Sequence, residues 1–359
     1  KEIYNNDFVN CPNWLLVEWK IGNAEYTSPL SMELLSYAHT LKMQEGLVER
    51  ALICRDRLGR MTRIQTRHLA SMSDHHLCAL TYEITPLNYS ESISIRSSLD
   101  GNIQNFGVPR YRQLTSKHWN LVHSQSTEDG IHLHMQTTHS EYDLVMYAKT
   151  VLQEDCNYLS PEKKVFKDKY RIYEEVEIEA RENSTYVLEK IVSLATSLDK
   201  DAQDDDYEAL ARQKLDSVSN FSQIYEPHVR AWQDLWDKAD IQIEGDRFTQ
   251  RSTRLHIYHL LVTASLHNTE IDAGMPARGL HGEAYRGHIF WDEVYILPFY
   301  DLHYPEICRS LLLYRYNRLD PARQYARDNG YQGAMYPWQT ADDGGEETQE
   351  VHYNPENKT

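Results

Sequence analysis

The stretch that decides the fold is LVERALICRDRLGRMTRIQTRHL, residues 47–69. Its ends are two runs of apolar and β-branched residues, Leu47–Cys54 and Met61–Leu69, which flank the turn-forming segment Asp56–Gly59. In the second run, β-branched residues alternate with polar ones: Thr62, Ile64 and Thr66 against Arg63, Gln65 and Arg67. This alternation is typical of a half-buried strand, and the glycine can take a positive φ in the turn, so the stretch predicts a β-hairpin.

Further runs of the same character occur through the first two hundred residues. They predict strands at Ser92–Arg96, Gly130–Thr137, Tyr170–Ala180 and Tyr186–Ala195. Turn residues such as Leu99–Asn102 lie between them. Many strands with short connections indicate an antiparallel β-sandwich, which we assign to residues 1–200.

The composition changes at Asp199–Asp206, an acidic run that predicts a domain boundary. Beyond it, apolar residues recur at helical spacing. They predict a helix from Tyr207, a second around His228–Ala239, a third at Gln250–Leu266 and a fourth at Glu306–Asn317 that ends before Pro321. The pattern predicts a helical linker over residues 201–244 and a helical domain over residues 245–359.

Bulk properties exclude several classes of function. The net charge of -17 argues against nucleic acid or an anionic membrane as a partner, because both require a basic surface. The five cysteines are widely spaced and form no CxxC pair, which argues against a disulfide framework or a structural zinc site. With no apolar run near 18 residues and no signal peptide, we expect a cytoplasmic protein. We also expect no bound metal ion, because no CxxC pair is present.

The densest group of functional residue types is ARGLHGEAYRGHIFWDEVYILP, Ala277–Pro298, which we name the central motif. Its glycines allow tight turns and the close approach of a ligand. An alternative is a buried polar cluster in which Arg278 or Arg286 pairs with Glu283 or Asp292. A metal site at His281 and Glu283 is disfavoured, since no second cluster offers matching ligands.

A second motif, GAMYPWQTADDGGEET, covers Gly333–Thr348. Tyr336 and Trp338 are candidates for a wall that stacks on a sugar, with Gln339 and a carboxylate to bind hydroxyl groups. The alternative is a proline turn followed by a solvated acidic run. His75, His76 and the other scattered histidines are interpreted as ordinary surface or core residues.

Both motifs resemble those of glycoside hydrolase family 65, a family of disaccharide phosphorylases and trehalases. Upstream segments resemble its N-terminal domain and connecting helix: Leu35–Tyr37, Arg55–Arg60, Ser97–Gly101 and His228–Trp232. The resemblance implies an N-terminal β-sandwich, a helical linker and the first part of a catalytic (α/α)6 barrel. It covers nearly the whole chain and leaves both ends of the family pattern incomplete.

The resemblance also implies an activity, the inverting phosphorolysis of an α-linked glucose disaccharide to β-glucose 1-phosphate and glucose. The partners would be the disaccharide and inorganic phosphate, with no other cofactor, and we expect a homodimer. Trp291 and Asp292 match the family's Trp-Asp pair that binds the glucosyl ring. Arg286, His288 and Trp338 are weaker candidates for the same pocket.

The catalytic residues of the family are not matched. Its general acid is a Glu in a Gly-Pro-(Asp/Asn)-Glu-Tyr segment, which we expect downstream of Thr359, so Glu346 and Glu347 are not assigned that role. Residues 245–359 can supply about three or four helices of average length, fewer than the barrel requires. We therefore expect the 359-residue chain alone to be inactive. An inverting trehalase-type hydrolase and a non-catalytic carbohydrate-binding fragment remain alternatives.

Overall fold

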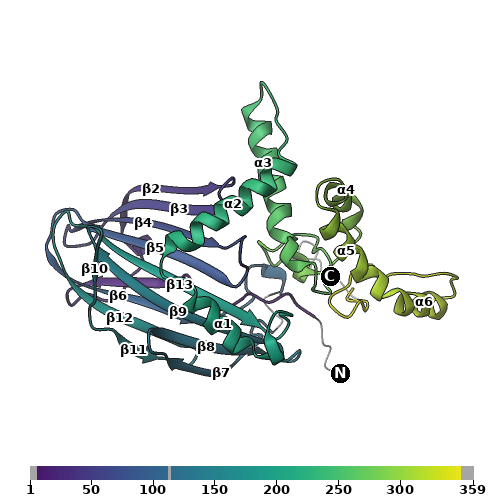
Figure 1. Cartoon of the computed structure of the whole chain (residues 1–359), viewed down its shortest axis with the longest axis horizontal. Helices are drawn as coiled ribbons and strands as arrows, with labels where there is room; N and C mark the ends of the chain where they lie inside the picture. Colours follow the sequence, from purple (N-terminus) through teal and green to yellow (C-terminus); the bar gives the residue numbers. More distant parts are fainter. Residues whose placement is uncertain (1–5, 112–114, 349–359) are drawn as a thin grey trace. The chain divides into compact units, whose positions relative to one another are not determined.

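The computed structural model describes residues 6–111 and 115–348 and divides them into two compact units. The sheet unit comprises Cys11–Ile103 and His118–Trp236. The helical unit takes the described residues of Lys1–Asn10, Gln104–Lys117 and Asp237–Thr359. Figure 1 labels the helices and most of the strands of these units.

The sheet unit is built on two antiparallel sheets, which confirms the predicted β-sandwich. The nine-stranded sheet has the order β2 (Glu33–Lys42), β3 (Leu47–Arg55), β4 (Met61–Ala70), β5 (Leu77–Pro86), β13 (Tyr186–Thr196), β9 (Asp143–Glu154), β8 (Gly130–Thr137) and β7 (Trp119–Ser126), with β10 (Asn157–Leu159) paired to β9. The four-stranded sheet has the order β1 (Val17–Ile21), β6 (Glu91–Asp100), β12 (Arg171–Ala180) and β11 (Lys164–Lys167).

The core lies between the two sheets. Trp19, Ile95 and Val176 of the smaller sheet pack in one buried cluster with Ile64 and Tyr186 of the larger sheet. The decisive hairpin forms as predicted, since β3 and β4 pair in register and Gly59 takes a φ of +83° in the turn. Thr62, Ile64 and Thr66 are buried along one face of β4, as the alternation predicts.

One predicted turn is wrong. Leu99 and Asp100 belong to β6, and the chain leaves the strand only at Gly101. The strand continues because Leu99 is fully buried and the backbone of Asp100 exchanges hydrogen bonds of 2.7 and 3.0 Å with Asn13.

Two helices, α1 (Tyr207–Asp216) and α2 (Phe221–Ala239), lie over the outer face of the nine-stranded sheet (Figure 1). They bury one shared cluster against the sheet, with Leu210 and Leu215 of α1 and Phe221 and Ile224 of α2 packed on residues that include Leu77. The hydrophobic effect on these apolar stripes therefore holds the helices to the sheet.

The predicted helix break near His228 is wrong. The break lies at residues 217–220, and α2 continues through Pro227 and His228. The side chain of Asn220 accepts a hydrogen bond of 3.1 Å from the amide of Gln223, which caps the new helix. Burial at a spacing of four, Ile224, His228, Trp232 and Trp236, keeps the helix continuous despite the proline.

Among its described residues, the helical unit contains α3 (Arg247–Thr263), α4 (Glu293–His303), α5 (Pro305–Asn317) and α6 (Leu319–Asp328). The third and fourth predicted helices correspond to α3 and α5, whereas α4 and α6 were not predicted. Pro321 lies in the first turn of α6, where a missing amide is tolerated. A partial (α/α)6 barrel and the boundaries at residues 200 and 244 stay predictions. No described helix combines the length and apolar character needed to cross a bilayer.

Candidate functional site

The central motif contains a left-handed turn. Within the 3-10 segment Ala284–Gly287, the φ angles of Tyr285, Arg286 and Gly287 are +56°, +58° and +72°. A non-glycine residue in this region costs about 1–2 kcal/mol, so the surrounding contacts must hold the turn in place.

The segment formed by residues 6–8 supplies part of that support. The amide of Phe8 donates a hydrogen bond of 3.0 Å to the carbonyl oxygen of Arg286. A Cβ atom at Gly287 would lie 2.2 Å from the Cβ of Phe8, so glycine is required for this approach.

The side chains of Arg286 and His288 are buried within the helical unit. Arg286 forms an ion pair with Asp7, and not with Glu283 or Asp292 as the sequence alternative supposed. The Nε2–H of His288 donates to the carbonyl oxygen of Asn6, while its Nδ1 accepts from the side-chain amide of Gln339. Burial lowers the pKa of His288, consistent with a neutral imidazole in this arrangement.

Glu283 connects three segments of the helical unit. Its carboxylate accepts hydrogen bonds from the side-chain amide of Asn10 at 2.7 Å, from the amide of Phe106 at 3.0 Å and from the amide of Gly107 at 2.7 Å. Glu283 therefore has an anchoring role, which the sequence could not indicate because its partners are distant along the chain.

A short antiparallel bridge joins the central motif to the second motif. Ile289 and Thr340 exchange backbone hydrogen bonds of 2.9 and 3.1 Å. Trp291 lies two residues after the first member and Trp338 two residues before the second, so antiparallel pairing brings the two indoles together. Their ring centroids are 6.3 Å apart, and the two residues are 52% and 59% exposed.

The bridge thus creates an exposed aromatic pair, Trp291 with Trp338, from residues 47 positions apart in the sequence. Asp292 follows Trp291 and directly precedes α4, where the helix dipole favours a carboxylate. Among the described residues, no hydrogen bond or ion pair engages the Asp292 carboxylate. Exposed indole faces and a carboxylate acceptor on the adjacent residue are group types suited to binding a polyhydroxylated ring.

Each tryptophan of this pair has a hydrogen-bonded carboxylate close to it in the chain, the buried Glu293 near Trp291 and the exposed Glu346 near Trp338. Glu293, at the start of α4, accepts hydrogen bonds from Arg315 at 2.9 Å and from the amide of Met275 at 3.2 Å. Burial raises the pKa of Glu293, and Arg315 opposes this effect. Glu346 accepts from the amide of Trp338 at 3.1 Å, and backbone donors of this kind keep its pKa low.

The five predicted sugar contacts therefore divide into two groups. Trp291, Asp292 and Trp338 lie at the accessible end of the bridge, whereas Arg286 and His288 are engaged in the buried polar cluster behind it. The cavity beside Arg286, lined also by Asp7 and Glu283, has a volume of only about 20 Å³ and cannot admit a sugar ring.

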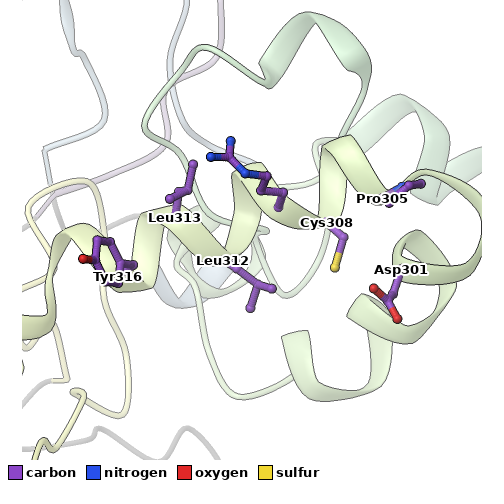
Figure 2. A pocket seen from close by; sticks show the side chains of 7 residues that line it. Asp301, Pro305, Cys308, Leu312, Leu313 and Tyr316 are labelled. Atoms are coloured by element: carbon purple, nitrogen blue, oxygen red, sulfur yellow. The ribbon is translucent and has the colours of Figure 1, made fainter.

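A larger cavity of about 300 Å³ lies on α4 and α5 (Figure 2). It is lined by Asp301, Pro305, Cys308, Arg309, Leu312, Leu313 and Tyr316, none of which is a predicted sugar contact. Burial raises the pKa of the Cys308 thiol, so this cysteine is a poor nucleophile.

His281 packs against His259, with 4.4 Å between the ring centroids. Convergent groups of possible metal ligands do occur among the described residues, but neither includes His281 or Glu283. The central motif therefore presents aromatic and carboxylate groups and not a ligand cluster.

Comparison with known proteins places these features in a family. Residues 1–235 match the glycosyl hydrolase family 65 N-terminal domain, and residues 254–359 match the glycosyl hydrolase family 65 central catalytic domain. A solved structure described as a putative kojibiose phosphorylase from the human microbiome shares the fold, with a TM-score of 0.82 and 21% identity over 96% of this chain and 43% of that one.

Three curated relatives span most of this chain. An uncharacterised glycosyl hydrolase of Mycobacterium tuberculosis is 37% identical over 98% of the chain and 26% of its own length. A kojibiose phosphorylase of Caldanaerobacter subterraneus is 35% identical over 95% of the chain and 44% of its own length. A trehalose 6-phosphate phosphorylase of Lactococcus lactis is 32% identical over 99% of the chain and 44% of its own length. The chain thus spans less than half of each of these relatives.

Proposed function

Because the chain belongs to glycosyl hydrolase family 65, we propose that it forms the glucosyl-binding side of a site for inverting disaccharide phosphorolysis. The substrate is an α-linked glucose disaccharide, and the products are β-glucose 1-phosphate and glucose. Relatives named for kojibiose and trehalose 6-phosphate support this substrate class without selecting one disaccharide.

The observation that carries the proposal is the Ile289–Thr340 bridge, which brings Trp291, the residue before Asp292, against Trp338. The indole faces would cover the apolar face of the glucosyl ring, and the Asp292 carboxylate would accept hydrogen bonds from its hydroxyl groups. Charge-assisted hydrogen bonds of this type contribute about 1.5–3 kcal/mol each.

Arg286 and His288 support the site without contacting the sugar. His288 bonds Gln339, which adjoins Trp338, and Arg286 fixes the turn that leads into Ile289. In this proposal they are positioning residues, because their side chains are buried and already engaged. The reaction needs phosphate as the nucleophile on one face of the glucosyl carbon and an acid that protonates the leaving oxygen on the other.

The experiment is phosphorolysis by the full-length protein that contains this chain, comparing wild type with Asp292→Asn. We expect the variant to lower kcat/KM by about 10–100-fold, since an amide replaces a charged acceptor. Asp320→Asn is the matched control, because the Asp320 side chain on α6 is highly exposed and pairs with Arg323 one turn further along the same helix. Equal kcat/KM for wild type and Asp292→Asn would remove Asp292 from the site.

Omission of phosphate separates the alternatives. A phosphorylase forms no product without phosphate, whereas an inverting trehalase-type hydrolase works equally well because water is its nucleophile. Binding of glucose disaccharides without turnover, under either condition, would support the non-catalytic carbohydrate-binding alternative.

A further inference from the structure

A second group of chemically active side chains lies in the sheet unit, on the outer face of the nine-stranded sheet and beneath α1. On β8, Ile131, Leu133 and Met135 point into the sandwich core. Since side chains alternate along a strand, His132 and His134 point to the opposite face. That face of the sheet is the one that α1 covers.

The neighbouring edge strand adds a third imidazole. The pairing of β7 with β8 shifts by one residue between Leu121 and His123, and the bulge sets His123 directly opposite His134. The ring centroids of these two histidines are 5.2 Å apart. Glu208, in the first turn of α1, extends its carboxylate toward these two histidines.

The possible ligand atoms converge. The Nδ1 of His134 lies 3.1 Å from Oε1 of Glu208, and the Nε2 of His123 lies 3.9 Å from that oxygen. One ligand atom from each of the three residues lies within 4.8 Å of the others. For comparison, ligands at 2.0–2.1 Å in a tetrahedral zinc site are about 3.3 Å apart.

Asp143 fixes which nitrogen of His134 faces this point. The Nε2–H of His134 donates a hydrogen bond of 2.8 Å to Oδ1 of Asp143, an oxygen that also accepts from Gln136. The Nδ1 of the ring therefore faces the Glu208 carboxylate. This nitrogen is buried and makes no hydrogen bond within the described structure, so its contact with Glu208 lacks hydrogen-bond geometry.

The convergent group does not include His132. That side chain is fully buried against Tyr147, with 4.2 Å between the ring centroids. The converging atoms are one nitrogen from each of His123 and His134 and one oxygen of Glu208, so a cation placed among them would contact all three.

We infer that His123, His134 and Glu208 bind a divalent transition-metal ion of the zinc class, with Asp143 orienting His134. Zinc sites in proteins commonly use two histidines and one carboxylate as ligands. A second carboxylate that accepts a hydrogen bond from a ligand histidine, as Asp143 does here, is also typical of them. His123 and Glu208 have side chains that are 40% and 38% exposed, which gives the ion a path from solvent. The ion would fasten the edge strand β7 to α1, and the inference does not depend on the proposed function.

The experiment is titration of the chelator-treated full chain with Co²⁺ and then Zn²⁺. We expect one equivalent of Co²⁺ to bind with the visible absorption of a four-coordinate site, and one equivalent of Zn²⁺ to displace it. Zn²⁺ is expected to raise the thermal unfolding midpoint, because an ion that binds only the folded state stabilises it. His134→Ala and Glu208→Gln should each abolish the absorption, and Asp143→Asn should weaken affinity by about 10–100-fold.

His39→Ala, an exposed histidine on β2, is the matched control and should bind like wild type. Far-UV circular dichroism verifies that each variant is folded, and Glu208→Gln preserves side-chain volume. Absence of stoichiometric binding by the folded wild-type chain would overturn the inference. Binding that persists in both His134→Ala and Glu208→Gln would also overturn it and would direct attention to Asp74, His75 and His76, the other convergent group.

Discussion

At the scale of single residues, Lys190 is the most unusual group in the sheet unit. It is fully buried between the two sheets, where its Nζ donates a hydrogen bond of 2.6 Å to the carbonyl oxygen of Ser98. Burial lowers its pKa to about 7, an effect that the buried Glu174 carboxylate opposes. The folded state therefore releases this proton well below the pH at which an unfolded lysine does.

This difference predicts a pH dependence of stability. Between about pH 7 and pH 10.5 the unfolded chain holds one more proton at Lys190 than the folded chain, so the free energy of unfolding rises with pH across that window. Replacement Lys190→Met should remove this contribution, which amounts to about 4–5 kcal/mol over the window. Urea unfolding at several pH values measures it as the wild-type minus variant difference.

The exposed Lys200 provides the control, since Lys200→Met should give a difference that does not vary with pH. A Lys190→Met difference that is constant from pH 7 to pH 10.5 would contradict the assigned lowering of the pKa of Lys190.

The role of a residue could be predicted from the sequence only where its functional partners lie nearby in the chain. Trp291, Asp292 and Trp338 were recognised because their neighbours in the chain form long motifs. The ion pair of Arg286 with Asp7 joins positions 279 residues apart, so no spacing could reveal it. For the same reason the sequence gives no sign that the histidines of β7 and β8 belong together, because the β-bulge and α1 bring them to Glu208 only in the folded protein.

At the scale of elements, burial alone does not decide which strands the sequence predicts. The strands β8 and β13 were predicted although neither has an exposed residue, whereas β5 was not predicted. β4 alternates between buried and exposed residues and was found. Nine of the ten residues of β5 are buried and the remaining one is half-buried, because the sandwich core covers one face and the helical layer the other. Such a strand loses its alternating pattern. The unpredicted α4 exposes Val294, Tyr295 and Leu302, so its apolar residues follow no single buried face.

The element-scale prediction concerns the anchoring of the central motif by Glu283. In Glu283→Gln one oxygen becomes an NH₂ group, so the amides of Phe106 and Gly107 compete for a single acceptor. We expect the free energy of unfolding to fall by about 1–3 kcal/mol and proteolytic cleavage within residues 104–111 to accelerate. Limited proteolysis with mass spectrometry locates the cut.

Glu244→Gln is the control, because Glu244 is exposed and is remote from this anchor in the sequence. Cleavage of Glu283→Gln at the wild-type rate would show that the three hydrogen bonds do not hold the segment.

At the scale of the whole molecule, the sequence predicted the division into a β-rich and a helix-rich part, but the order of strands was beyond it. β13, the last strand in the chain, lies between β5 and β9 in the middle of the larger sheet. Its place follows from burial on both faces, a tertiary requirement that no local pattern encodes. Likewise, α1 and α2 were predicted as a linker, yet they form a layer over the outer face of that sheet.

Because α1 packs on the sheet, a cavity created by one substitution in α1 should lower the free energy of unfolding markedly. Leu215 of α1 is fully buried against the sheet in a cluster with Ala211 and Val218, so Leu215→Ala removes apolar contacts that rigid neighbours cannot replace. We expect the free energy of unfolding to fall by about 2–5 kcal/mol, measured by urea titration. Leu58→Ala, at a turn residue that is 78% exposed, should change it by less than about 0.5 kcal/mol. If Leu215→Ala and Leu58→Ala lowered the free energy of unfolding equally, the packing of α1 on the sheet would not contribute to the stability of the sheet unit.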